Sequence, residues 1–153
     1  MGMEIERKFL ANEEWNPKGK GIVVRQGYLP QSGELLVRIR RQDDKAYITL
    51  KGRTTSITRA EYEYEIPVGD ADELFTFCSR PLIEKERYIE NFEGHIWEVD
   101  KFFGENDGLI VAEIELKDEN EKFEKPSWLG KEVSGDARYY NSNLIKNPFK
   151  NWK

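Results

Sequence analysis

The stretch Glu61-Tyr62-Glu63-Tyr64-Glu65-Ile66 alternates acidic side chains with apolar or aromatic ones. A β-strand projects successive side chains to opposite faces, so this stretch predicts a strand with one acidic face and one apolar face. The same period of two recurs along the chain, and turns containing Gly, Pro, Asn or Asp separate many of the segments. These segments are residues 4–6, 37–40, 48–51, 85–89, 97–100 and 111–116. Seven or more short strands with short connections indicate an antiparallel sheet or barrel.

Helices are fewer than strands. Residues 70–80 begin with a candidate Asp cap, contain apolar residues and end before Pro81. Residues 136–146 form a second candidate, with a cap near Ser134 or Asp136 and an end before Asn147. The sequence therefore predicts an α+β fold, mostly antiparallel β, as a single domain over residues 1–153.

Composition excludes several classes of protein. The chain has 24 Lys and Arg against 29 Asp and Glu, a net charge of −5, and 35% charged residues. An ordinary domain has about 25%. Aromatic residues make up 12% of the chain, which argues against disorder. There is no apolar run long enough for a membrane span or signal peptide, and Cys78 has no disulfide partner. We expect a cytoplasmic protein with no membrane partner, and the acidic balance argues against nucleic acid.

The charges are sorted by strand. Residues 61–65 and 113–115 present acids, whereas Arg38 and Arg40 make one face basic. Like charges two residues apart repel, which costs stability unless a counter-charge is bound. Two interpretations follow: a solvated face, or a curled sheet whose charged face lines the inside. About eight strands enclose room for one small ligand. Carboxylates suit Mg²⁺ or Mn²⁺, and Arg and Lys suit phosphate oxygens, so the second interpretation predicts a site for a metal-bound polyanion.

The pentapeptide Glu4-Ile5-Glu6-Arg7-Lys8 resembles the N-terminal signature of the CYTH superfamily, also called triphosphate tunnel metalloenzymes. Further stretches resemble its successive strands, in order, at residues 26–29, 37–40, 47–52, 59–63, 85–88, 97–102, 112–115 and 131–133. The length is similar to that of the small, single-domain bacterial members. The resemblance implies a closed eight-stranded antiparallel barrel with a few flanking helices, forming a tunnel open at both ends.

The resemblance also implies roles for the charged residues. Carboxylates from several strands would hold Mg²⁺ or Mn²⁺, namely Glu4, Glu6, Glu61, Glu63, Glu113 and Glu115. Basic side chains would bind phosphates, namely Lys8, Arg38, Arg40, Lys51, Lys85, Arg87 and Arg138. Tyr28 and Lys8 would be catalytic. Glu65, Glu98 and Asp100 stay open between support of the metal and pairing with cations. The alternatives are solvated acids, plain ion pairs, a helix-capping Arg138 and a core tyrosine at position 28.

The expected function is a metal-dependent triphosphatase that hydrolyses inorganic tripolyphosphate or a related small-molecule triphosphate. One alternative is an adenylyl cyclase of the CYTH type, which converts ATP to cyclic AMP in the same tunnel. Another is a barrel that binds polyphosphate or nucleotide without turnover. The oligomeric state is left open, with a homodimer as one option.

Overall fold

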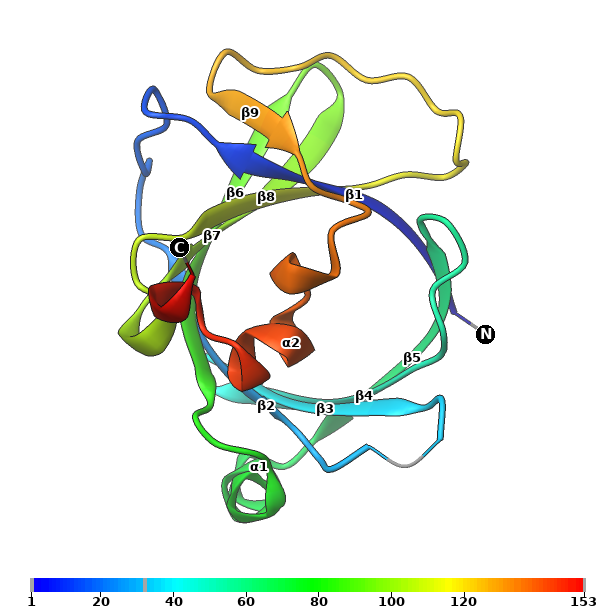
Figure 1. Ribbon diagram of the computed structural model, residues 1–153, viewed down its shortest axis with the longest axis vertical. Helices are drawn as coiled ribbons and strands as arrows, with labels where there is room; N and C mark the ends of the chain where they lie inside the picture. The colour runs from blue at the N-terminus through cyan, green and yellow to red at the C-terminus, as the bar shows by residue number, and fades with distance from the viewer. Residues whose placement is uncertain (1, 32, 153) are drawn as a thin grey trace.

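The computed structural model describes residues 2–31 and 33–152. Strands dominate these residues and surround a central space (Figure 1). The strands are β1 (Met3–Ala11), β2 (Ile22–Tyr28), β3 (Leu36–Gln42), β4 (Lys45–Lys51), β5 (Thr58–Ile66), β6 (Ile83–Phe92), β7 (His95–Phe102), β8 (Ile110–Glu115) and β9 (Leu129–Glu132). The predicted α+β class, mostly antiparallel β, is confirmed.

The sheet closes on itself. Hydrogen-bonded neighbours follow the order β5-β4-β3-β2-β6-β7-β8-β1, and β1 pairs back onto β5. That closing ladder places Met3 opposite Ala60 and Ile5 opposite Thr58. All of these pairs are antiparallel. The predicted closed eight-stranded barrel is therefore confirmed.

Strand β1 has more partners than an ordinary barrel strand. Along one edge it pairs with β8, from Glu6 opposite Glu115 onward. Along the other edge it pairs first with β5 and then with β9, where Phe9 lies opposite Glu132. Strand β9 is thus an addition to the eight-stranded barrel, and it extends the sheet outside the closed ring.

Two short α-helices flank the barrel, and both predicted helices were too long. Helix α1 (Val68–Leu74) begins after Pro67 and passes into a 3₁₀ turn over Phe75–Phe77. Helix α2 (Asn141–Lys146) follows a separate 3₁₀ turn, because Tyr140 has an extended backbone with ψ of 132° that breaks the predicted stretch. No helix among the described residues has the length and apolar character needed to cross a bilayer.

Apolar packing lies mostly outside the barrel wall. Helix α1 covers β3 and β4, where Ile39 is fully buried in a cluster with Phe75. A second cluster, under the loop between β8 and β9, packs Phe9 against Trp97 with ring centroids 5.7 Å apart. Coverage is incomplete, since Tyr64 on β5 is 58% exposed. The interior is left to polar and charged side chains.

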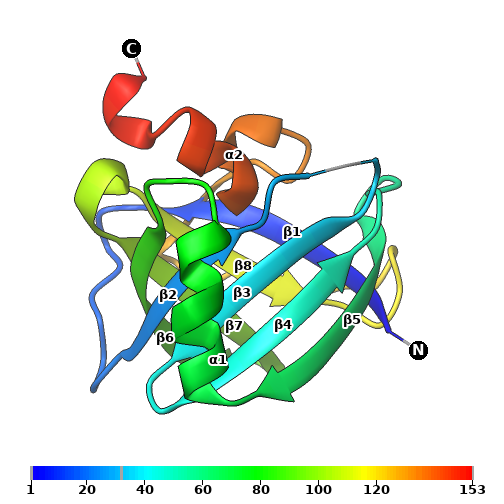
Figure 2. The same cartoon turned by 90° about the horizontal axis from the view of Figure 1, so that it is seen from below.

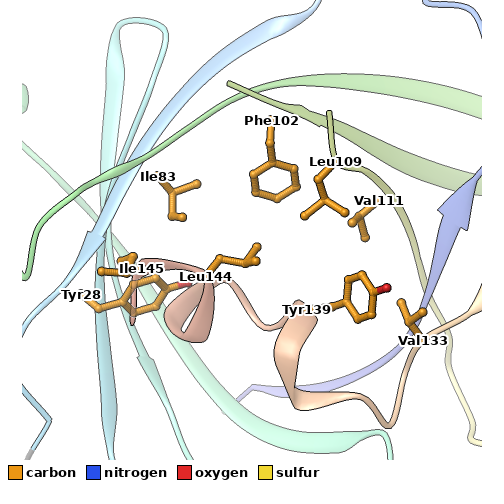
Figure 3. Packing of buried hydrophobic residues seen from close by; sticks show 9 residues of the cluster. All are labelled: Tyr28, Ile83, Phe102, Leu109, Val111, Val133, Tyr139, Leu144 and Ile145. Atoms are coloured by element: carbon orange, nitrogen blue, oxygen red, sulfur yellow. The ribbon is translucent and has the colours of Figure 1, made fainter. Parts of the chain in front are cut away.

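The C-terminal segment, residues 137–152, lies across one end of the barrel (Figures 1 and 2). Its Leu144 and Ile145 are buried in a cluster that includes Tyr28 and Ile83 (Figure 3). The resemblance implied a tunnel open at both ends, whereas here α2 covers one of them. We call this the covered end.

Candidate functional site

A cavity of about 770 Å³ runs inside the barrel. Nearly all the charged side chains that the sequence analysis singled out line it. They are Glu4, Glu6, Lys8, Arg38, Arg40, Lys51, Glu61, Glu63, Lys85, Arg87, Glu98, Glu113 and Glu115, together with Tyr28. The charged faces of the strands therefore point inward, and the solvated-face interpretation is wrong for these residues.

Strand register explains how residues far apart in the chain meet. Residues directly opposite each other in a sheet share a face, so an inward residue faces inward residues on its neighbours. Lys8 on β1 lies opposite Glu113 on β8, and Glu113 lies opposite Glu98 on β7. Lys51 on β4 lies opposite Glu61 on β5. Each lysine thereby gains an acidic neighbour that the sequence alone does not pair with it.

One side of the cavity is strongly acidic, and its carboxylates repel one another. Desolvation, with a contribution from Glu61, raises the pKa of Glu4 to about 7 although Lys51 opposes it. Desolvation and the charges of Glu113 and Glu4 raise the pKa of Glu6 to about 8. Since like charges crowded in a low dielectric favour protonation, this cluster would gain most from a bound cation.

The chemistry of this cluster fits a hard divalent ion. Carboxylate oxygens are the ligands that Mg²⁺ and Mn²⁺ prefer. Among residues 2–31 and 33–152, no three His, Cys, Asp or Glu side chains converge closely enough to form a ready metal site. Lysine accounts for part of this, because Lys51 Nζ lies 3.3 Å from Glu4 Oε1 and 3.2 Å from Glu61 Oε2. A metal would take the place of this ammonium group between the two acids.

The arginines on β3 keep unused hydrogen-bonding capacity. Arg38 donates to Thr49 Oγ1 at 3.1 Å and to Glu63 at 3.2 Å, yet its buried Nε has no partner. Arg40 donates its Nε to Gln26 at 2.9 Å, and no described carboxylate forms an ion pair with it. Burial, with the neighbouring Arg38 and Arg87, lowers the pKa of Arg40 to about 9. An anion in the cavity would satisfy both guanidinium groups.

Asp100 lies behind the cavity lining and holds two of the basic residues. It is 2% exposed, and it accepts two hydrogen bonds from Arg87, at 2.7 and 2.9 Å. Lys85 Nζ lies 2.8 Å from the same carboxylate. Although burial opposes ionisation, Arg87 and Lys85 hold the pKa of Asp100 well below its ordinary value. Of the two roles left open for Asp100, the structure places it in the second, as a partner of cations.

Lys8 and Tyr28 approach the cavity near its covered end. Lys8 Nζ lies 3.3 Å from Glu113 and donates to the Tyr139 carbonyl at 3.3 Å. Burial opposes the charge of Lys8, but Glu113 and Glu6 outweigh it and raise the pKa of the lysine. The Tyr28 hydroxyl accepts a hydrogen bond from Gln26 at 3.1 Å.

Two predicted residues lie apart from the others. Arg138 does not line the cavity; it pairs with Asp136 at 2.6 Å and lies over the Trp152 ring at 4.9 Å. Glu65 is exposed on β5, beyond the lined part of the strand. Both are in or near charged patterns, but position along the strand or helix keeps them out of the cavity.

Three uncharged polar residues were missed by the sequence analysis. Gln26 and Thr49 are fully buried, and Gln26 lines the cavity, each bonded to an arginine of β3. Asn141 lines the covered end from α2. Gln26 alternates in phase with Tyr28, and Thr49 with Lys51, which is the signal that could have found them. No local pattern marks Asn141, because its place depends on how the C-terminal segment folds back.

Comparisons with known proteins agree with this geometry. The CYTH domain family matches residues 2–141. The inorganic triphosphatase of Acetivibrio thermocellus is 55% identical over 155 aligned residues, which cover 100% of this chain and 99% of that protein. The inorganic triphosphatase of Nitrosomonas europaea is 34% identical over 92% of this chain and 95% of that protein. The crystal structure of the inorganic triphosphatase NE1496 matches with a TM-score of 0.67 and 33% identity, over 92% of this chain and 96% of that chain. The chain therefore belongs to the CYTH domain family.

Proposed function

We propose that this protein is a metal-dependent inorganic triphosphatase that hydrolyses tripolyphosphate inside the barrel. One observation carries the proposal: a single cavity brings mutually repelling carboxylates together with guanidinium groups that lack acidic partners. A triphosphate with a divalent cation supplies both missing counter-charges at once. The names of the relatives agree with this substrate class.

Glu4, Glu6, Glu61, Glu63, Glu113 and Glu115 are the candidate metal ligands. The bound ion, Mg²⁺ or Mn²⁺, would neutralise phosphate oxygens and make a bound water more acidic. Phosphoryl transfer otherwise asks a protein mainly for positioning and charge stabilisation. Arg38, Arg40, Lys51, Lys85 and Arg87 would hold the phosphates and stabilise the leaving group.

Lys8 and Tyr28 would act on the terminal phosphoryl group. Lys8 keeps its charge because Glu113 faces it, so it can stabilise the oxygens of the transferred group. The Tyr28 hydroxyl already accepts a hydrogen bond from Gln26, which orients it. In this position it can orient the attacking water and take up its proton. The cytoplasmic location belongs to the same proposal and rests on the single, unpaired cysteine.

The direct test is to incubate the purified protein with tripolyphosphate, ATP or thiamine triphosphate, each with Mg²⁺, Mn²⁺ or EDTA. We expect phosphate release that needs the metal and is fastest with tripolyphosphate. No phosphate from any substrate would contradict the proposal. Cyclic AMP from the ATP sample would favour the cyclase, and metal-dependent binding without turnover would favour a binding barrel.

Neighbouring arginines on β3 provide a matched pair of variants. Arg40 faces the cavity, whereas Arg41 faces outward and pairs with Asp72 at 3.2 Å. Arg40→Gln should lower kcat/KM by about 100-fold, because it removes a charge-assisted contact to phosphate. Arg41→Gln should change it by less than about twofold. Equal losses in the two variants would remove Arg40 from the phosphate-binding group.

A further inference from the structure

Asn141, the first residue of α2, reaches the cavity from a segment that is not part of the barrel wall. Its side-chain oxygen accepts one hydrogen bond from Lys85 Nζ at 3.0 Å and another from Gln26 Nε2 at 3.0 Å. The two donors come from β6 and β2, which pair directly with each other. A lysine ammonium can only donate, so the oxygen of the Asn141 amide must be the atom that faces Lys85.

Gln26 extends this contact across the cavity wall. Its Oε1 accepts from Arg40 at 2.9 Å, and its Nε2 donates to the Tyr28 hydroxyl at 3.1 Å as well as to Asn141. A guanidinium also only donates, so Arg40 fixes the orientation of the Gln26 amide. One hydrogen-bonded chain therefore joins Arg40, Gln26, Asn141 and Lys85, and it touches Tyr28.

The position of Asn141 is set by packing that does not involve the cavity. Leu144 and Ile145, which follow it in α2, are buried at 0% and 5% exposure in the cluster at the covered end. Among the described residues, the other acceptor for Lys85 is Asp100, which Arg87 already occupies with two hydrogen bonds. Without Asn141, Lys85 would be drawn toward Asp100, behind the cavity lining.

We propose that Asn141 is a positioning residue of the phosphate-binding group, which holds Lys85 and Gln26 at the covered end of the cavity. Through Gln26 it also sets the orientation of Arg40 and Tyr28. This inference rests on the proposed triphosphatase function and adds to it that the C-terminal segment helps to set the affinity for the substrate. Asn141 acts through its neighbours and takes no part in bond breaking.

The test compares Asn141→Ala and Asn141→Asp with Asn151→Ala and Asn151→Asp. Asn151 is an exposed asparagine of the same segment and lies outside the cavity lining. We expect Asn141→Ala to raise KM for tripolyphosphate about tenfold and to change kcat by less than about threefold. Asn141→Asp should raise KM further, because its carboxylate pairs with Lys85 and repels the phosphates. Both Asn151 variants should match the wild type.

A purely structural role predicts the opposite order, since aspartate has the shape of asparagine and alanine does not. A KM of Asn141→Asp within twofold of the wild type would overturn the proposal. So would losses in both Asn141 variants that merely follow a fall in Tm. Should the wild type release no phosphate, the proposed function fails. Calorimetric titration of the same variants with tripolyphosphate would then still decide the positioning role, by the same order of Kd values.

Discussion

Asp100 and Glu98 alternate in phase on β7, yet they have different surroundings. Glu98 lines the cavity and lies 3.2 Å from Arg87, with its side chain 42% exposed. Asp100 is two residues further along the same face and is almost fully buried between Lys85 and Arg87. Depth along the strand therefore decides whether an inward acid faces the ligand space or supports the residues that do.

Removing the Asp100 charge should be costly because it leaves two cations buried without their shared partner. We expect Asp100→Asn to lower the free energy of unfolding by about 3–5 kcal/mol. Urea denaturation of the metal-free protein measures this. Asp44→Asn, in the exposed turn between β3 and β4, is the control and should change it by less than about 0.5 kcal/mol. A small effect of Asp100→Asn would mean that Lys85 and Arg87 find other partners.

The Asp100 contribution should also depend on pH in a defined direction. Its pKa in the folded protein is held below the unfolded value of about 3.9. The stabilisation is therefore present above that value and is lost as the pH falls toward the folded pKa. The stability difference between the wild type and Asp100→Asn should be constant from pH 7 to 5 and shrink between about pH 4 and 2. A difference that grew on acidification would contradict the assignment.

At the scale of elements, Gly27 on β2 shows how the outside of the barrel constrains the inside. A Cβ at this position would lie 2.6 Å from Leu82 Cδ2 and 2.9 Å from Cys78 Cβ. The connection between α1 and β6 therefore packs directly on the β2 backbone. The neighbouring residues of β2, Gln26 and Tyr28, are held in the cavity by this contact.

Gly27→Ala should lower the free energy of unfolding by about 1–3 kcal/mol, because a methyl group must be forced into a packed contact. Thermal or urea unfolding measures the loss. Combining Gly27→Ala with Cys78→Gly, which removes one of the contacted Cβ atoms, should recover part of it relative to Cys78→Gly alone. Additive effects of the two substitutions would show that the contact is not the cause.

How far the sequence predicts these elements depends on whether the signal is local. The alternation in residues 61–66 predicts both the strand and its acidic face, because the side-chain period of a strand is two. The added strand β9 was missed as an addition to the ring, since only its pairing with β1 defines it. Asn141 was missed for the same reason: its partners, Gln26 and Lys85, are remote in the chain. Glu65 and Glu63 share a pattern, and only the depth of the cavity separates them.

For the whole molecule, the barrel has its apolar packing outside and at one end, and its charges inside. Ionised acids crowded in such an interior oppose folding until a counter-ion is present. Stability and ligand binding are therefore linked: whatever binds the folded cavity and not the unfolded chain stabilises the protein.

Mg²⁺ or Mn²⁺ should accordingly raise Tm at pH 8, by an amount that corresponds to about 2.7 kcal/mol at 100 times Kd. NaCl at the same ionic strength is the control for general screening. Glu6→Gln should lose most of this shift, while its metal-free Tm equals or exceeds that of the wild type, because one repelling charge is gone. Equal shifts with metal in both proteins would exclude Glu6 as a ligand.

The position of β1 between β5, β8 and β9 has a consequence for how the protein is made. The first strand to leave the ribosome finds its partners in the middle and near the far end of the chain. The carboxylates of Glu4 and Glu6 must therefore wait in an unpaired strand until β8 has been synthesised. Contacts so distant in sequence form slowly. Synthesis is thus nearly complete before the ring can close, and a nascent chain that stalls earlier has no cavity in which to bind a metal or a phosphate.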